Sequence, residues 1–77
     1  MPREYPTYTA VVRRGREVAT GTGTRKRAAI RVVRSLLRRL APGAKGEVRV
    51  TPPGKKRGTL IYQAHTDAAG KIVAEEM

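Results

Sequence analysis

The sequence contains no cysteine, no tryptophan and no phenylalanine, and its only aromatic residues are three tyrosines. Without cysteine the chain has neither a disulfide framework nor a thiolate ligand for a metal. A single histidine does not supply the three or four ligands that zinc requires. The hydrophobic core must therefore be aliphatic, and in a chain of 77 residues it can only be thin.

Long apolar runs are also missing. No segment approaches the roughly 18 to 20 apolar residues of a membrane-spanning helix, and the N-terminal residues MPREYPTYT lack the apolar stretch of a secretory signal. We therefore expect a cytoplasmic protein without a membrane partner.

Residues suited to catalysis are scarce. His65 lies in a predicted strand with no nucleophile or carboxylate close in sequence, so it is interpreted as a surface imidazole. Asp67 fits the turn TDAAG, and the glycines of 20–24, TGTGT, lack the lysine of a phosphate-binding loop. The sequence predicts no enzymatic activity, no metal and no cofactor.

Acidic residues are few: six face seventeen lysines and arginines, which gives a net charge of +11. No acid occurs between Glu17 and Glu47, and residues 1–58 hold sixteen of the basic residues but only three of the acids. A chain charged in this way attracts polyphosphates. A GC-rich genome would also enrich arginine, so the positions of the arginines are more informative than their number.

Residues 24–40, TRKRAAIRVVRSLLRRL, are predicted to form an amphipathic helix around which the fold is organised. Four arginines recur at i, i+4, i+7 and i+11, so they lie on one side along roughly 16 Å of helix axis. The opposite arc is apolar and predicts the core face. The arginines are Arg27, Arg31, Arg34 and Arg38, and the apolar residues are Ala29, Ile30, Val32, Val33, Leu36, Leu37 and Leu40.

The arginines of this segment do not favour the helix itself. Like charges at i, i+4 destabilise a helix, and Arg25, Lys26 and Arg27 fall at the positive end of the helix dipole, where cations are unfavourable. An external polyanion would compensate both effects, which indicates nucleic-acid binding. The alternative is an ordinary solvated face.

The remaining segments predict strands and turns around this helix. Alternating, β-branched residues favour strands, and the resulting order β-β-α-β-β-β predicts an α+β fold with two layers, a single helix packed on an antiparallel sheet. We expect a loose arm over 1–6 and one domain over 7–77. The predicted strands are 7–13, 17–20, 47–51, 59–66 and 71–75, with a turn at Gly15, flexible turn residues 20–24, a helix cap at Thr22 or Thr24, and a helix end at Pro42 and Gly43.

Alternation also predicts which strand residues face the helix. The other face of the sheet would then carry Val11, Ile61 and Val73, and such a cluster favours a homodimer interface. Scattered surface aliphatics are the alternative. The residues expected to face the helix are Ala10, Val12, Val18, Val48, Val50, Leu60, Tyr62, Ala64, Ile72 and Ala74, and those expected on the outer face also include Arg13, Arg49, Gln63 and His65.

Together these features predict a small basic nucleic-acid-binding protein, cytoplasmic or nucleoid-associated and of bacterial or phage type. The scarcity of aromatic residues for base stacking favours a duplex, and DNA is favoured over RNA because a helix can enter its major groove. The main alternative is a protein-interaction module that docks on an acidic protein, and adsorption to an anionic membrane is weaker. Beyond the four helix arginines, the expected contacts are Arg25, Lys26, Arg13, Arg14, Arg16, Lys55, Lys56 and Arg57.

Overall fold

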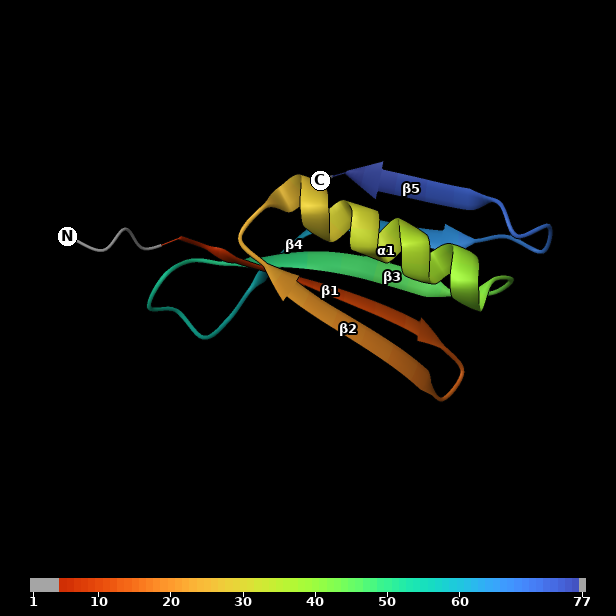
Figure 1. Ribbon diagram of the computed structural model, residues 1–77, viewed down its shortest axis with the longest axis horizontal. Coiled ribbons are helices and arrows are strands. Elements are labelled where there is room, and N and C mark those ends of the chain that lie inside the picture. The colour runs from red at the N-terminus through yellow and green to blue at the C-terminus, as the bar shows by residue number, and fades with distance from the viewer. Residues whose placement is uncertain (1–4, 77) are drawn as a thin grey trace.

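The chain folds into one helix and five strands in the predicted order β-β-α-β-β-β (Figure 1). The computed structural model describes residues 5–76, so most of the predicted arm lies outside it. The single helix stands between a pair of strands and a run of three strands, as the α+β prediction requires. The elements are β1 (Thr7–Arg14), β2 (Glu17–Gly23), α1 (Lys26–Leu40), β3 (Lys45–Thr51), β4 (Thr59–Thr66) and β5 (Ile72–Glu76).

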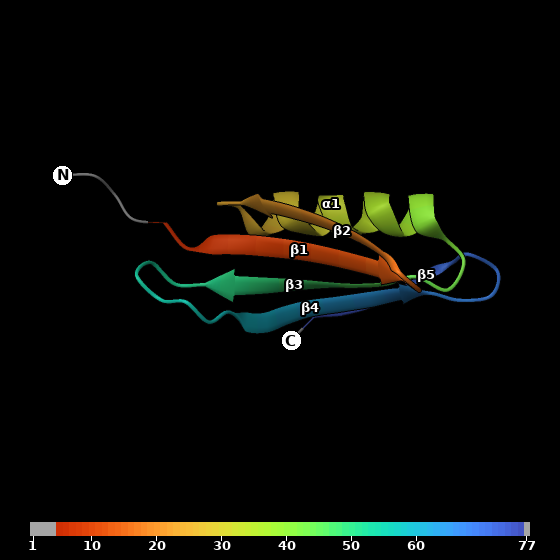
Figure 2. The same ribbon diagram turned by 90° about the horizontal axis from the view of Figure 1, so that it is seen from below.

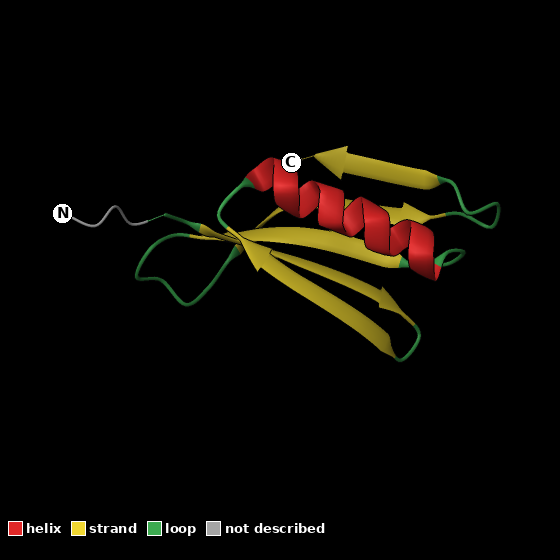
Figure 3. Cartoon of the chain, viewed as in Figure 1, coloured by secondary structure: helices red, strands yellow, loops and turns green. Residues whose placement is uncertain are grey.

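The five strands form a single sheet in the order β2-β1-β3-β4-β5, and every neighbouring pair is antiparallel. α1 crosses one face of this sheet, and the opposite face carries no second layer in the described chain (Figures 2 and 3). This arrangement confirms the predicted two-layer α+β architecture. A third layer is not required, because an antiparallel sheet can keep one face in water.

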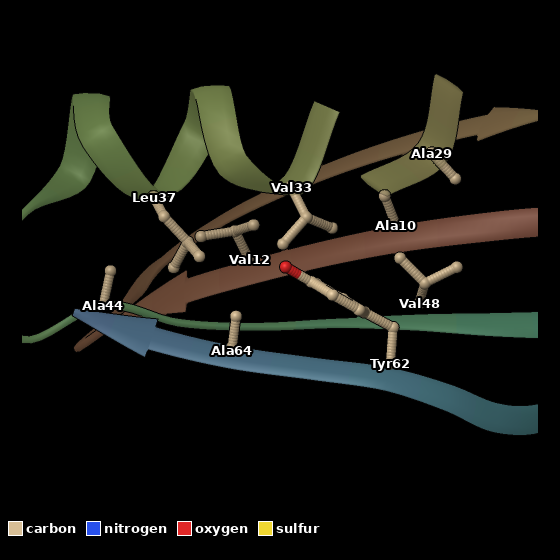
Figure 4. Packing of buried hydrophobic residues seen from close by; sticks show 9 residues of the cluster. All are labelled: Ala10, Val12, Ala29, Val33, Leu37, Ala44, Val48, Tyr62 and Ala64. Atoms are coloured by element: carbon tan, nitrogen blue, oxygen red, sulfur yellow. The ribbon is translucent and has the colours of Figure 1, made fainter. Parts of the chain in front are cut away.

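The core lies between α1 and the three central strands. One residue per helix turn is buried, at Ala29, Val33 and Leu37, since spacings of three and four residues keep side chains on one face. The side chains that meet them rise from β1, β3 and β4 (Figure 4). The complete buried apolar set is Ala10, Val12, Ala29, Val33, Leu37, Ala44, Val48, Tyr62 and Ala64.

Gly46 on β3 allows the helix to approach the sheet closely. A Cβ atom at this position would lie 2.8 Å from Cγ1 of Val33 and 3.2 Å from Cγ2 of Val12. Both valines are fully buried, so neither side chain has free space into which it could move. The absence of a side chain at Gly46 therefore determines the distance between the two layers.

The loops at the C-terminal end of α1 are fixed by short polar contacts. The hydroxyl of buried Thr66 accepts a hydrogen bond from the Ala44 amide at 2.9 Å, and the Thr66 amide donates to the Ala44 carbonyl at 2.9 Å. As predicted, Asp67 stabilises its turn, because its carboxylate accepts hydrogen bonds from the amides of Ala69 and Lys71. Gly15 has a φ of 59° in the β1–β2 turn, which also agrees with the prediction.

Two predictions near the start of the helix are wrong. Residues 20–24 were expected to be turn material, but β2 continues to Gly23 because its backbone pairs with β1, where Thr22 lies opposite Thr9 and Gly23 opposite Tyr8. The helix begins at Lys26, and its N-cap residue Arg25 makes no side-chain capping hydrogen bond. With Thr22 inside a strand, neither predicted threonine caps the helix.

A β-bulge changes which side chains of β4 face the helix. The pairing of β3 with β4 shifts between Val48 and Arg49, so that Tyr62 lies opposite Val48 but Leu60 lies opposite Arg49. The extra residue, Ile61, packs against the core, which reverses the predicted orientations of Leu60 and Ile61. Val18 was also predicted incorrectly: it pairs with Arg13 on the outer face, and its side chain is 56% exposed.

Candidate nucleic-acid interface

The helix presents its arginines to solvent on one flank. Ala29, Val33 and Leu37 point into the core, and Val32 faces β2, where its Cγ1 lies 3.3 Å from the position that a Cβ atom of Gly21 would occupy. The flank away from β2 carries a stripe of four exposed side chains. We call this set the arginine stripe: Arg27, Arg31, Arg34 and Arg38.

Among residues 5–76, no carboxylate lies within 4 Å of the charges of the arginine stripe. Over residues 5–76 the one ion pair is that between Arg49 and Glu47, 3.3 Å apart on the far side of the sheet. The sixteen lysines and arginines of this part of the chain are all exposed. The stripe is therefore a row of solvated cations that the fold does not neutralise.

The N-terminal turn of α1 adds to this positive surface. It contains no acidic residue, and Arg25, Lys26 and Arg27 are exposed there. Cations at this end of a helix are opposed by the partial positive charge of the free backbone N–H groups. The arrangement that the sequence predicted is thus present, and it destabilises the isolated helix.

The two basic loops lie at opposite ends of the helix instead of forming one cluster (Figure 1). The β3–β4 loop, with exposed Lys55, Lys56 and Arg57, extends from the end where α1 begins. The β1–β2 turn lies at the end where α1 finishes, and there Nε of Arg14 donates a hydrogen bond to the Pro42 carbonyl at 3.1 Å. The β1–β2 turn also lies at the β2 edge of the sheet, whereas the arginine stripe faces away from β2.

The basic residues of the β1–β2 segment are divided between two faces. Arg13 pairs with Val18 on β2 and Lys45 on β3, and its side chain lines the outer face of the sheet. Arg14 contacts the connection after α1, on the helix side. Arg13 therefore does not share a surface with the arginine stripe, although the sequence placed it with Arg14 and Arg16.

A concave groove of about 670 Å³ occupies the outer face of the sheet. Its charged side chains come from adjacent strands and include both signs. The sequence did not predict Lys45 here because the expected strand began at residue 47, although alternation from Glu47 would have placed it on this face. The residues that line the groove are Val11, Arg13, Lys45, Gly46, Glu47, Gln63, Ala64, His65, Val73, Ala74 and Glu75.

Neither a cluster of metal-ligating side chains nor a membrane-spanning helix occurs among residues 5–76. Within residues 5–76, histidine and acidic side chains do not come together in groups of three that could hold a metal ion. In the same range α1 is neither long enough nor apolar enough to cross a membrane. No protein-family model, curated protein or solved structure matches the chain significantly.

Proposed function

We propose that this protein binds double-stranded nucleic acid, with duplex DNA favoured, through the arginine stripe of α1. The observation that carries the proposal is the row of four exposed arginines, none of which has a carboxylate partner among residues 5–76. Phosphates would supply the missing negative charge, and arginine suits them because its planar guanidinium donates two parallel hydrogen bonds. Such a role corresponds to a cytoplasmic or nucleoid-associated protein.

The helix is suited to a duplex by its position and shape. It lies on top of the sheet (Figure 2), and its four stripe arginines are exposed. A helix of roughly 10 to 12 Å diameter fits the B-DNA major groove, which is about 12 Å wide. The major groove of A-form RNA is too narrow for such an entry. This comparison favours DNA over RNA.

The tyrosines do not form a platform for single-stranded bases. Tyr62 is buried in the core at 3% exposure, and Tyr8 is partly buried against it. Tyr5 remains exposed, but one ring cannot stack successive bases in the way that single-strand-binding surfaces do. Binding that depends on phosphates instead of bases is the mode that this surface supports.

The basic loops extend the contact beyond the helix. The arginine stripe covers roughly 16 Å, and the β3–β4 loop and the β1–β2 turn lie toward the two ends of α1 (Figure 1). We expect Lys55, Lys56, Arg57, Arg14 and Arg16 to contact flanking phosphates, so the total should exceed the four contacts of the stripe. Each contact releases a counterion and steepens the salt dependence of binding.

The test compares the native protein with Arg31→Gln/Arg34→Gln and with Arg13→Glu, two variants with the same change in net charge. Each is titrated into labelled DNA duplex, RNA duplex and single strands at several salt concentrations, at nanomolar protein. The stripe variant should lose at least about tenfold in affinity for DNA, and the slope of log K against log[salt] should fall by about 1.8. Arg13→Glu should bind like the native protein because Arg13 lies on the opposite face.

Two results would contradict the proposal. Native-like binding by the stripe variant would show that the helix is not the contact surface. Failure of the native protein to bind any of these nucleic acids at low salt would remove the function altogether. An acidic protein recovered by pull-down after nuclease treatment would then be the partner to test.

A further inference from the structure

The outer face of the sheet differs from the rest of the surface in its balance of charge. From Arg25 to Arg39 the helix side carries seven basic residues and no acid. The outer face instead interleaves Arg13, Lys45 and Arg49 with Glu47 and Glu75. A polyanion has little preference for such a surface, whereas a protein with the same mixture of charges complements it.

The charges of the outer face are ordered in two parallel rows. Strand pairing places Arg13, Lys45 and His65 side by side on β1, β3 and β4, and we call this the basic row. Glu47, Gln63 and Glu75 lie side by side on β3, β4 and β5 as the acidic row. The rows are two residues apart along each strand, which corresponds to roughly 6.8 Å.

We propose that the outer face binds a second copy of this chain, sheet against sheet, with each basic row over the acidic row of the other copy. A twofold axis that runs across the strands, midway between the rows, produces this arrangement. It places Lys45 opposite Glu47 of the second copy, and by symmetry the pair occurs twice. An axis parallel to the strands would instead place like charges opposite each other, so the rows also select the orientation.

The apolar side chains of the face fit the same arrangement. Val11 would lie opposite the Arg13 stem of the second copy, and Val73, which is 46% exposed, opposite the stem of Glu75; long charged side chains cover apolar surface in this way. The sheet is five strands wide, roughly 24 Å at 4.8 Å per strand. The surface area that this face would bury lies at the lower end of the range for specific interfaces, which predicts a dimer that dissociates on dilution.

The high net charge does not prevent this association. Stacked sheets lie roughly 10 Å apart, and each helix lies on the far side of its own sheet (Figure 2). The two arginine stripes would therefore be separated by at least two Debye lengths at physiological salt, each about 8 Å. If the proposed function also holds, the outward helices of one dimer would contact two separate duplexes.

A charge-swap experiment tests the dimer without nucleic acid. The mass of the native protein, Lys45→Glu, Glu47→Lys and the double variant is measured by sedimentation over a dilution series into the high-micromolar range. We expect a native dimer, at least tenfold weaker association in each single variant, and recovery in the double variant. Lys71→Glu, in the exposed β4–β5 turn, has the same charge change as Lys45→Glu; it is the control for that variant and should associate like the native protein.

Circular dichroism separates loss of association from loss of folding, particularly for Glu47→Lys, which also breaks the pair with Arg49. A native protein that stays monomeric at every concentration would overturn the proposal. So would a dimer that neither single variant weakens, or a double variant that does not recover. Because no nucleic acid is present, none of these outcomes bears on the proposed function.

Discussion

Removal of arginines from the stripe should raise the stability of the free protein and, at the same time, weaken its binding to nucleic acid. Arg27 and Arg31, Arg31 and Arg34, and Arg34 and Arg38 are neighbours at spacings of four, three and four residues on α1. All are exposed, and in the described part of the chain none has a carboxylate within 4 Å. The substitution Arg31→Gln/Arg34→Gln removes all three repulsive pairs, and glutamine has nearly the same helix propensity as arginine.

The expected gain follows from the number of pairs. Each like-charge pair on a helix costs about 0.2 to 0.5 kcal/mol, so the free energy of unfolding should rise by about 0.6 to 1.5 kcal/mol. In a domain of this size, 1 kcal/mol shifts the unfolding temperature by about 4 to 8 °C. The midpoint should therefore rise by roughly 2 to 12 °C, measured by circular dichroism at about 0.01 M salt, where screening is weak.

The control for this experiment is Arg39→Gln. Arg39 is exposed in the last turn of α1, and no basic residue lies three or four positions before it. It interacts favourably with the negative end of the helix dipole, so its loss should lower the stability slightly. In 1 M salt both effects should disappear. An unchanged midpoint in the stripe variant at low salt, or a gain that persists in 1 M salt, would refute the reasoning.

Two further predictions concern the core. Gly46→Ala should lower the free energy of unfolding, measured in urea, by about 1 to 3 kcal/mol, because the new Cβ would lie 2.8 Å from Cγ1 of Val33. The double variant Gly46→Ala/Val33→Ala should lose less stability than the sum of the two single losses. Strict additivity of the losses would argue against a clash. Tyr62→Phe should leave the free energy of unfolding unchanged or raise it by up to about 1 kcal/mol, because the buried hydroxyl (Figure 4) has no hydrogen-bond partner within residues 5–76. A clear loss of stability would reveal a partner for it.

The fold could be predicted from the sequence where one local signal dominates. The apolar spacing of α1 and the alternation of β4 predicted the bounds of these elements to within two residues. Burial of one face stabilises each element strongly, so its hydrophobic period is clear in the sequence. β2 was predicted too short because threonine and glycine in 20–24 favour turns locally. Pairing with β1 satisfies the backbone of these residues as a strand, and this long-range contribution is not visible in the segment itself.

The orientations of Leu60 and Ile61 illustrate a different limit. Alternation assigns faces correctly only while the count of residues is uninterrupted, and the bulge adds one residue to β4. At the candidate site, too, some features follow from local sequence and others from the arrangement of the strands. Local periodicity correctly aligned the arginine stripe, whereas the separation of Arg13 from Arg14, and of the two basic loops, depends on how the strands are arranged in the sheet.

The burial of one residue per turn in α1 has a consequence for how this protein can change over evolution. The helix buries Ala29, Val33 and Leu37 and packs Ile30, Leu36 and Leu40 against the core, while its solvent-facing half contributes nothing that the core requires. Substitutions on that half, at Ala28 or Ser35 for example, can accumulate without loss of the folded state. The helix surface can therefore diversify toward new targets while the scaffold beneath it is preserved, and the same property makes it suitable for directed evolution.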